Sequence, residues 1–197
     1  LITNNLIYKI MGCFPITANI NSCGVTDVNF TFEQDALIGN WDDIASFTRN
    51  SSNPLLINSL VLKATAKMYT VIFKEDKPMD TLAETTEDKV YAKPSKVEGD
   101  IVVYGKSPAA AYTKYLLSNN KVFMILKQAA KKGTSSYWVI LGLESGLRPM
   151  AGNNFDKDRG GYVHKFVADT LTYPQEFLWA DAGLAATEAI ITELQVA

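Results

Sequence analysis

The longest alternation of apolar and polar side chains runs from Asn58 to Asp76, in the stretch NSLVLKATAKMYTVIFKED. Its period of two and its β-branched and aromatic residues predict a strand with one buried face. About 16 residues at about 3.3 Å each would span about 50 Å, whereas most strands have about 5–6 residues. We therefore expect a neighbouring subunit to complete part of this strand. The polar positions that would line a channel or an inter-subunit contact are Lys63, Thr65, Lys67 and Tyr69.

Similar patterns predict further strands along the chain. They lie at Val25–Glu33, Asp100–Tyr104, Lys121–Lys127, Tyr137–Leu143, Gly161–Asp169 and Thr170–Trp179. The third and fourth of these have apolar residues at consecutive positions, so we expect a hairpin that is covered on both faces. The segment Asp35–Pro54 is polar and rich in turn residues, and we expect Trp41 and Phe47 to anchor it to the body.

One helix is predicted at Ser107–Ser118. Ser107 is a good N-cap residue, Pro108 suits the first helical position, and the alanines that follow favour a helix. An apolar stripe at helical spacing, which we expect to pack in the core, consists of Tyr112, Tyr115 and Leu116. The C-terminal segment Asp181–Ala197 fits either a helix or a strand.

The segment Glu75–Lys89 is acidic, with six acids against two lysines and a local net charge of −4. It is either a solvated loop between strands or a projecting hairpin tip that contacts another subunit. Loops longer than about 12–15 residues are uncommon in compact domains unless they are functional or disordered. The residues expected to make such a subunit contact are Asp80, Glu84, Glu87 and Asp88.

The composition limits the possible functions. The chain has 197 residues, 47% of them hydrophobic, and a net charge of −2. This is enough for one substantial core, and it lacks the basic excess of a protein that coats nucleic acid. No apolar run approaches the roughly 20 residues of a membrane span, and no secretory signal is present. Cys13 and Cys23 make no disulfide framework, and a single histidine leaves a zinc site short of ligands.

Motifs for catalysis or metal binding fail on spacing. Counted from Asn154, an EF-hand would need Gly at the sixth position and Glu at the twelfth, where the chain has Arg159 and Lys165. The sequence GLESG displaces the serine of a nucleophile elbow by one position, and the only histidine, His164, lies within a predicted strand. There is no P-loop or dinucleotide fingerprint. We therefore expect no enzyme activity, no cofactor and no metal site.

These elements predict one domain over residues 1–197, mainly β with one flanking α-helix (α+β). We expect a β-sandwich or barrel in which a long strand pair contributes to an inter-subunit β-barrel.

The order of elements from Val122 to Trp179 resembles that of the tail-tube (major tail) proteins of bacteriophages that infect Bacteroidetes-type hosts. In that pattern a Leu-Gly step leads to a Gly-Leu step, and an Asp-x-x-Gly-Tyr motif then opens a long strand. The matching residues are Leu141, Gly142, Gly146, Leu147, Asp158, Gly161 and Tyr162.

The resemblance implies a virion structural protein that is assembled in the host cytoplasm. Its copies would form hexameric rings whose inner strands close into one barrel, and the stacked rings would form a channel for genomic DNA. The helix would pack outside the sheet, and the acidic segment would reach a neighbouring subunit or the next ring. Each phosphate that a cation captures adds affinity, so a neutral or acidic channel favours DNA passage. Unpaired Lys63 and Lys67 in the channel would oppose this role.

Two other readings remain open. A neck or head-tail connector ring, or the tube of a contractile injection system, would share the fold and could contact other tail or neck proteins. A monomeric β-sandwich module that binds carbohydrate would instead present exposed aromatic residues on a loop rim. The candidates for such aromatic residues are Trp41, Trp138 and Trp179.

Overall fold

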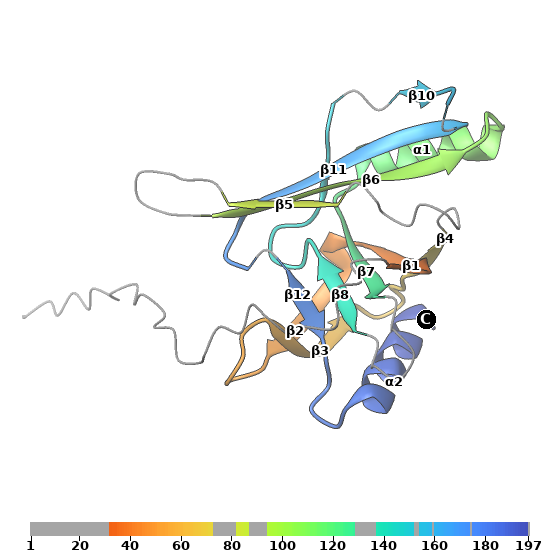
Figure 1. Ribbon diagram of the computed structural model, residues 1–197. Coiled ribbons are helices and arrows are strands. Elements are labelled where there is room, and N and C mark those ends of the chain that lie inside the picture. The colour runs from red at the N-terminus through yellow and green to blue at the C-terminus, as the bar shows by residue number, and fades with distance from the viewer. Residues whose placement is uncertain are drawn as a thin grey trace, which may run out of the picture.

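The structure is a computed structural model that describes residues 32–72, 82–86, 94–128, 137–151, 154–158, 160–173 and 175–196. In this part the chain is mainly β with two α-helices, an α+β fold, and its two sheets are open rather than closed. The expected fold had one flanking helix, and the second helix lies in the C-terminal segment, which the sequence left open between a helix and a strand. Figure 1 shows the smaller sheet lying across the larger one, with the second helix at the opposite side of the larger sheet.

The larger sheet, sheet A, has the strand order β2-β3-β12-β8-β7-β1-β4. Its strands are β1 (Phe32–Asn40), β2 (Ile44–Arg49), β3 (Leu56–Leu62), β4 (Tyr69–Ile72), β7 (Val122–Gln128), β8 (Trp138–Leu141) and β12 (Glu176–Leu178). A 3-10 helix, η1 (Trp41–Asp43), connects β1 to β2. β7 and β8 pair antiparallel at the centre of the sheet, which confirms the predicted apolar strand pair.

The smaller sheet, sheet B, has the order β10-β11-β6-β5, and β9 also pairs with β11. Its strands are β5 (Ala83–Thr86), β6 (Ser95–Tyr104), β9 (Arg148–Pro149), β10 (Phe155–Asp156) and β11 (Gly161–Leu171). β6 and β11 pair antiparallel along nearly their whole length. They confirm the strands predicted at Asp100–Tyr104 and Gly161–Asp169 and extend both of them.

Two hydrophobic cores lie on opposite faces of sheet A. Successive side chains of a strand point to opposite faces, so Met124 and Leu126 of β7 pack in one core and Phe123 and Ile125 in the other. The first core lies between the sheets and includes Phe166 of β11. The second core lies on the far face of sheet A. β7 is therefore covered on both faces, as its run of apolar residues predicts.

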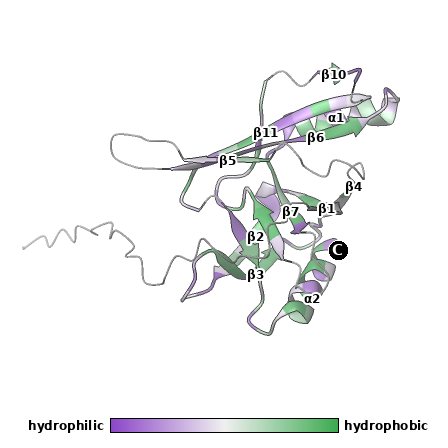
Figure 2. Cartoon of the chain, in the orientation of Figure 1, coloured by the Kyte–Doolittle hydropathy of each residue, from purple (hydrophilic) through white to green (hydrophobic). Residues whose placement is uncertain are grey.

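Helix α2 (Leu184–Gln195) covers this second core, so the C-terminal segment has the helical one of its two predicted alternatives. It buries Ile191 and Leu194 against sheet A and also buries Thr187. The Thr187 hydroxyl accepts a hydrogen bond from the backbone N–H of Ala180 (3.0 Å) and donates one to the Gly183 carbonyl (3.0 Å). Figure 2 shows hydrophobic and hydrophilic bands on this helix, as its single buried side requires.

Helix α1 (Pro108–Asn119) confirms the predicted helix and its N-cap, because Ser107 Oγ accepts a hydrogen bond from the Ala110 N–H at 3.1 Å. It packs against β11 and β6. Only Ala110 of the helix is buried, and Leu117 packs beside the first core. The tyrosine stripe lies on the other side and is exposed, so the prediction that it packs in the core is wrong.

The predicted strand Asn58–Asp76 is not continuous. β3 ends at Leu62 and β4 begins at Tyr69, with a turn between them. In this turn the Ala66 N–H donates to the Lys63 carbonyl at 3.0 Å, and Thr65 has a φ of +68°. The Met68 N–H then donates to the carbonyl of Leu194 on α2 at 2.7 Å. The alternating pattern continues through the turn, but this contact with α2 fixes a bend that the local sequence does not indicate.

Two predictions concern the segments before β3. Asp35–Pro54 is not mainly a turn region, because it holds most of β1, η1 and all of β2. Of the strand predicted at Val25–Glu33, only Phe32 and Glu33 are described, as the beginning of β1. The remainder of that strand, Cys13 and Cys23 lie outside the described residues.

Candidate functional site

The four polar residues predicted to line a channel do not share a strand face. Lys63, Thr65 and Lys67 lie in the turn between β3 and β4, and Tyr69 begins β4. The Lys63 ammonium donates to the carbonyl of Asp42, and Lys67 Nζ lies 5.9 Å from the ring centroid of Tyr69. The predicted strand Asn58–Asp76 is interrupted at these residues. Its length therefore no longer supports a role as the wall of a channel.

The acidic segment is only partly described. Glu84 lies in β5, whose four residues are all exposed, so part of the predicted loop is a strand at the edge of sheet B. Asp80, Glu87 and Asp88 lie outside the described residues.

Sheet B has one face in the first core and a second face, which we call the outer face, that carries charges. Directly opposite residues of an antiparallel pair share a face, so Asp100 lies with Lys165 and Glu98 with Val167. The charged residues of the outer face are Lys96, Glu98, Asp100, Arg148, Lys165 and Asp169. Among the described residues, this face therefore carries three basic and three acidic side chains, of which Asp100 is buried.

Some of the charged side chains of the outer face form ion pairs with one another. Lys96 pairs with Glu98, and Arg148 pairs with Asp169. Exposed pairs of this kind contribute about 0–1 kcal/mol to stability, so their main effect is on the electrostatic potential of the face. The outer face offers anions alternating charges of both signs rather than a continuous basic track.

The described edge of sheet B at β5 has no further strand partner, since β5 pairs with β6 alone among the described strands. An unpaired strand edge presents N–H and C=O groups in a row and favours pairing with another chain. Edge β5 is thus a natural place for a second chain to join sheet B.

Helix α1 presents an uncharged face to solvent. Tyr112 and Tyr115 are each 63% exposed and Leu116 is 40% exposed. The only charged residue of α1 is Lys114, whose ammonium lies 5.0 Å from the ring centroid of Tyr162 on the sheet-facing side. Tyrosine enrichment and the absence of charge are features of the central part of protein interfaces.

The Asp-x-x-Gly-Tyr motif fixes the beginning of β11. Asp158 lies in the turn before the strand, and at Gly161 a Cβ atom would lie 2.5 Å from the carbonyl oxygen of Val103. The close approach of β11 to β6 therefore requires glycine there. The Tyr162 ring packs edge-on against Phe155 with the ring centroids 5.3 Å apart. In this chain the motif has a structural explanation.

His164 is fully buried beneath α1, in the core-facing side of β11. Neither ring nitrogen has a hydrogen-bond partner in the described part of the chain, and the ring stacks on Phe166 with the centroids 6.2 Å apart. Burial, and then the positive charge of Lys114, lower the pKa of His164, so the ring is neutral at pH 7. His164 lies within β11, in agreement with the strand predicted for it, and its ring is packed in the interior.

A network of charged and aromatic side chains surrounds Arg49, the last residue of β2. Its guanidinium pairs with the carboxylate of Glu176 and, through Nη2, lies 3.1 Å from Glu144 Oε1. The same group lies 5.3 Å from the ring centroid of Phe47 and 4.7 Å from that of Tyr173. Arg49 thus links β2 with β12, with the residues after β8 and with those after β11.

Glu176 is the buried acid of this network, with 3% of its surface exposed. Burial raises the pKa of Glu176 to about 7, although the hydrogen bond and the charge of Arg49 act in the opposite direction. Glu144 has a second partner, since its Oε2 accepts the Thr172 N–H at 2.7 Å. The sequence analysis did not identify this network, because its members lie far apart in the chain.

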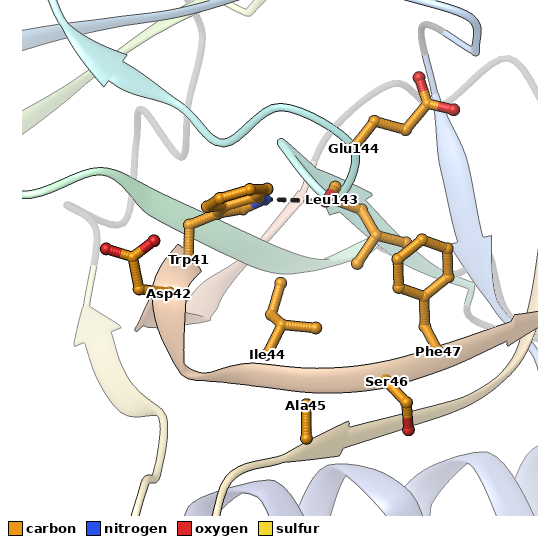
Figure 3. Close-up of a pocket in the computed structure, with 8 residues that line it drawn as sticks. All are labelled: Trp41, Asp42, Ile44, Ala45, Ser46, Phe47, Leu143 and Glu144. Carbon is orange, nitrogen blue, oxygen red and sulfur yellow. Dashed lines mark hydrogen bonds between the residues drawn. The ribbon is translucent and has the colours of Figure 1, made fainter.

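A cavity of about 450 Å³ lies beside β2 (Figure 3). Trp41, Ile44 and Phe47 point toward Leu143 across it, and the lining also includes Asp42, Ala45, Ser46 and Glu144. The Trp41 indole N–H donates to the Leu143 carbonyl at 2.9 Å, which holds one wall in place. Because this region was expected to be a turn-rich loop, the sequence analysis did not identify the cavity.

The structure gives little support to a carbohydrate module built on the three tryptophans. All three are half-buried. The ring of Trp41 is covered by Lys121, whose Nζ lies 3.7 Å from the ring centroid, and Trp138 faces Lys127 at 5.6 Å. A lysine thus occupies one side of each of these two rings, and Trp41 also lines the cavity beside β2.

Two negative findings concern the part of the chain that the structure describes. No group of three or more His, Cys, Asp or Glu side chains there is arranged to hold a metal ion. In the same part, neither helix has the length and apolar character needed to cross a bilayer.

Comparison of the chain with models of protein families, with curated proteins and with solved structures gives no match.

Proposed function

We propose that this chain is a virion structural protein, a subunit that assembles with identical copies into the rings of a phage tail tube. The observation that carries the proposal is the outer face of sheet B, a long charge-balanced surface next to an exposed strand edge. In the proposed ring, sheet B forms the wall of the channel in place of the predicted strand Asn58–Asp76. The resemblance at Val122–Trp179, which includes β11, supports the same conclusion.

The charge pattern of the outer face suits a channel through which DNA passes without being held. A protein that neutralises phosphates with lysine and arginine releases counterions and gains affinity for each contact. On the outer face each basic residue has an acidic residue on the same surface, and two such pairs are in contact. A wall of this kind would let DNA pass through non-specifically.

Self-association also agrees with the free surfaces of the chain. Joining sheet B of one copy to sheet B of the next would pair the edge at β5, and closing the ring would remove the exposed edges. A contact between different surfaces of identical subunits gives a ring when its rotation closes. The uncharged face of α1 would contact a neighbouring subunit in the same assembly.

The other ring-forming assemblies that the sequence left open would use the same face of sheet B. A neck or head-tail connector, or a tube in a contractile injection system, would also use sheet B to line a channel. They differ in what passes through the channel and in the tail or neck proteins at its ends.

The proposal is tested by light scattering and negative-stain imaging of the full chain as its concentration is raised. We expect rings with a central pore, or stacks of them. Ala83→Lys, at the exposed edge β5 and opposite Glu98, should abolish them by placing a charge on the joining edge.

The matched control is Ala189→Lys on the exposed side of α2, four residues before Glu193. This variant should assemble like the wild type. A wild-type chain that stays at 21.7 kDa at every concentration, or rings that form equally well from Ala83→Lys, would contradict the proposal.

A further inference from the structure

The cavity beside β2 adjoins one of the edges of sheet A in the described part of the molecule. β2 pairs with β3 on one side and with no described strand on the other. Residues Ile44 to Phe47 line the cavity as a continuous stretch, and Leu143 and Glu144 form its opposite wall. The cavity is therefore a largely apolar groove that runs along the edge of β2 that has no partner among the described strands.

The groove is held in shape by its own contacts. The hydrogen bond from the Trp41 indole to Leu143 closes one end, and Lys121 covers the Trp41 ring. At the other end the guanidinium of Arg49 lies over Phe47. A groove that needs no rearrangement loses less free energy on binding, because its side chains are already ordered.

The polar groups of the groove differ at its two ends. Glu144 is already bound to Arg49 and to the Thr172 N–H. Asp42 is exposed, and its carboxylate has no partner in the described part of the chain. The Lys63 ammonium is bonded to the backbone carbonyl of Asp42 and only partly offsets this charge. One end thus offers a free carboxylate, while the lining itself contains no basic side chain.

We propose that this groove binds an extended peptide segment of a partner protein. The segment would add as a strand to β2 through backbone hydrogen bonds and insert one bulky apolar side chain between Trp41, Ile44 and Phe47. A basic residue beside that side chain would pair with Asp42. Strand addition supplies affinity through the backbone, and the pocket and the charge supply selectivity. This inference goes beyond the tail-tube role and does not depend on it.

The test uses fluorescein-labelled octapeptides and fluorescence anisotropy with the full chain. One probe is Ser-Lys-Thr-Leu-Thr-Val-Thr-Ser, and its reversed sequence allows for either strand direction. A second pair has Glu in place of Lys, and a third has Ser in place of Leu. We expect the better Lys peptide to bind at least about tenfold more tightly than its Glu and Ser counterparts, a difference of about 1.4 kcal/mol.

Two exposed carboxylates provide matched variants. Asp42→Asn should reduce the preference for Lys over Glu to less than about threefold, and it should keep the preference for Leu over Ser. Asp158→Asn, in the turn before β11, should behave like the wild type. Both variants should unfold at the wild-type temperature, because neither carboxylate is buried.

Three results would overturn the inference. One is the absence of binding by the Lys peptides at about 1 mM protein. Another is equal binding of the Lys and Glu peptides by the wild type. The third is a change in mass by light scattering for Asp42→Asn without any change in peptide binding, which would assign the groove to a contact between copies of this chain.

Discussion

The two sheets of this molecule bury their strands to different degrees. β7 in sheet A lies between two cores, with five consecutive residues buried, Val122 to Leu126. β6 and β11 in sheet B pack one face in the first core, and their other face carries charged residues together with valines such as Val102 and Val163. The central strands of sheet A therefore contribute mainly to stability, whereas sheet B has partly exposed charged residues on its outer face and an edge at β5 with no partner among the described strands.

The largest expected effect is at the centre of sheet A. Phe123→Ala removes a fully buried ring from the second core and should lower the free energy of unfolding by about 3–5 kcal/mol. Val167→Ala, on the outer face of sheet B and half-buried, should cost less than about 1 kcal/mol. Urea denaturation measures both. Similar losses for the two variants would contradict the difference in burial.

Glu176 should make the stability of the network between β2 and β12 depend on pH. Its pKa is raised from 4.5 to about 7 in the folded chain, so the folded state holds this proton more tightly than the unfolded state. The resulting stabilisation is full below pH 4.5 and is lost as pH rises through 7, by up to about 3 kcal/mol. Glu176→Gln should remove this decline.

The measurement is the free energy of unfolding at pH 4.5, 6, 7 and 8 for the wild type and for Glu176→Gln. Glu188→Gln, at an exposed position of α2, is the control and should keep the wild-type profile. A wild-type curve that runs parallel to that of Glu176→Gln over this range would show that Glu176 titrates normally.

A smaller effect is expected where β11 begins. Gly161→Ala places a Cβ 2.5 Å from the Val103 carbonyl, so β11 and β6 must separate, at a cost of about 1–3 kcal/mol. Gly160→Ala meets no atom within 4 Å, but its φ of +71° costs about 1 kcal/mol in an L-residue. Thermal unfolding of both variants checks the order. A larger loss of thermal stability for Gly160→Ala would show that the contact between β11 and β6 contributes less to stability than the turn before β11.

The sequence predicted the strands of both sheets best where burial follows one simple period. β7 is apolar and buried on both faces from Val122 to Leu126, and β8 is apolar throughout, while β11 alternates because only one face is buried. The helix at α1 follows from Ser107, Pro108 and the alanines, which act locally. These signals depend on neighbouring residues in the chain, so sequence alone is enough for them.

The failures come from contacts between distant segments. The bend at Lys63–Met68 is fixed by a hydrogen bond to α2, about 126 positions away in the chain, since Met68 bonds to Leu194. The stripe of Tyr112, Tyr115 and Leu116 on α1 was predicted to face the core, but the opposite side, which includes Ala110, faces it instead. That side is also apolar, and its smaller residues let the helix approach the sheet closely. The site beside β2 and the Arg49 network depend on residues from four separate segments, which no local pattern indicates.

The most direct test of the central claim is amide hydrogen exchange at β5, followed at low and at high protein concentration. If sheet B joins copies of the chain through this edge, the amides of Ala83–Thr86 should exchange more slowly in the assembled chain by at least about tenfold. Those of β7 should be slow at both concentrations. Unchanged exchange at β5 in an assembled sample would show that the subunits join through another surface.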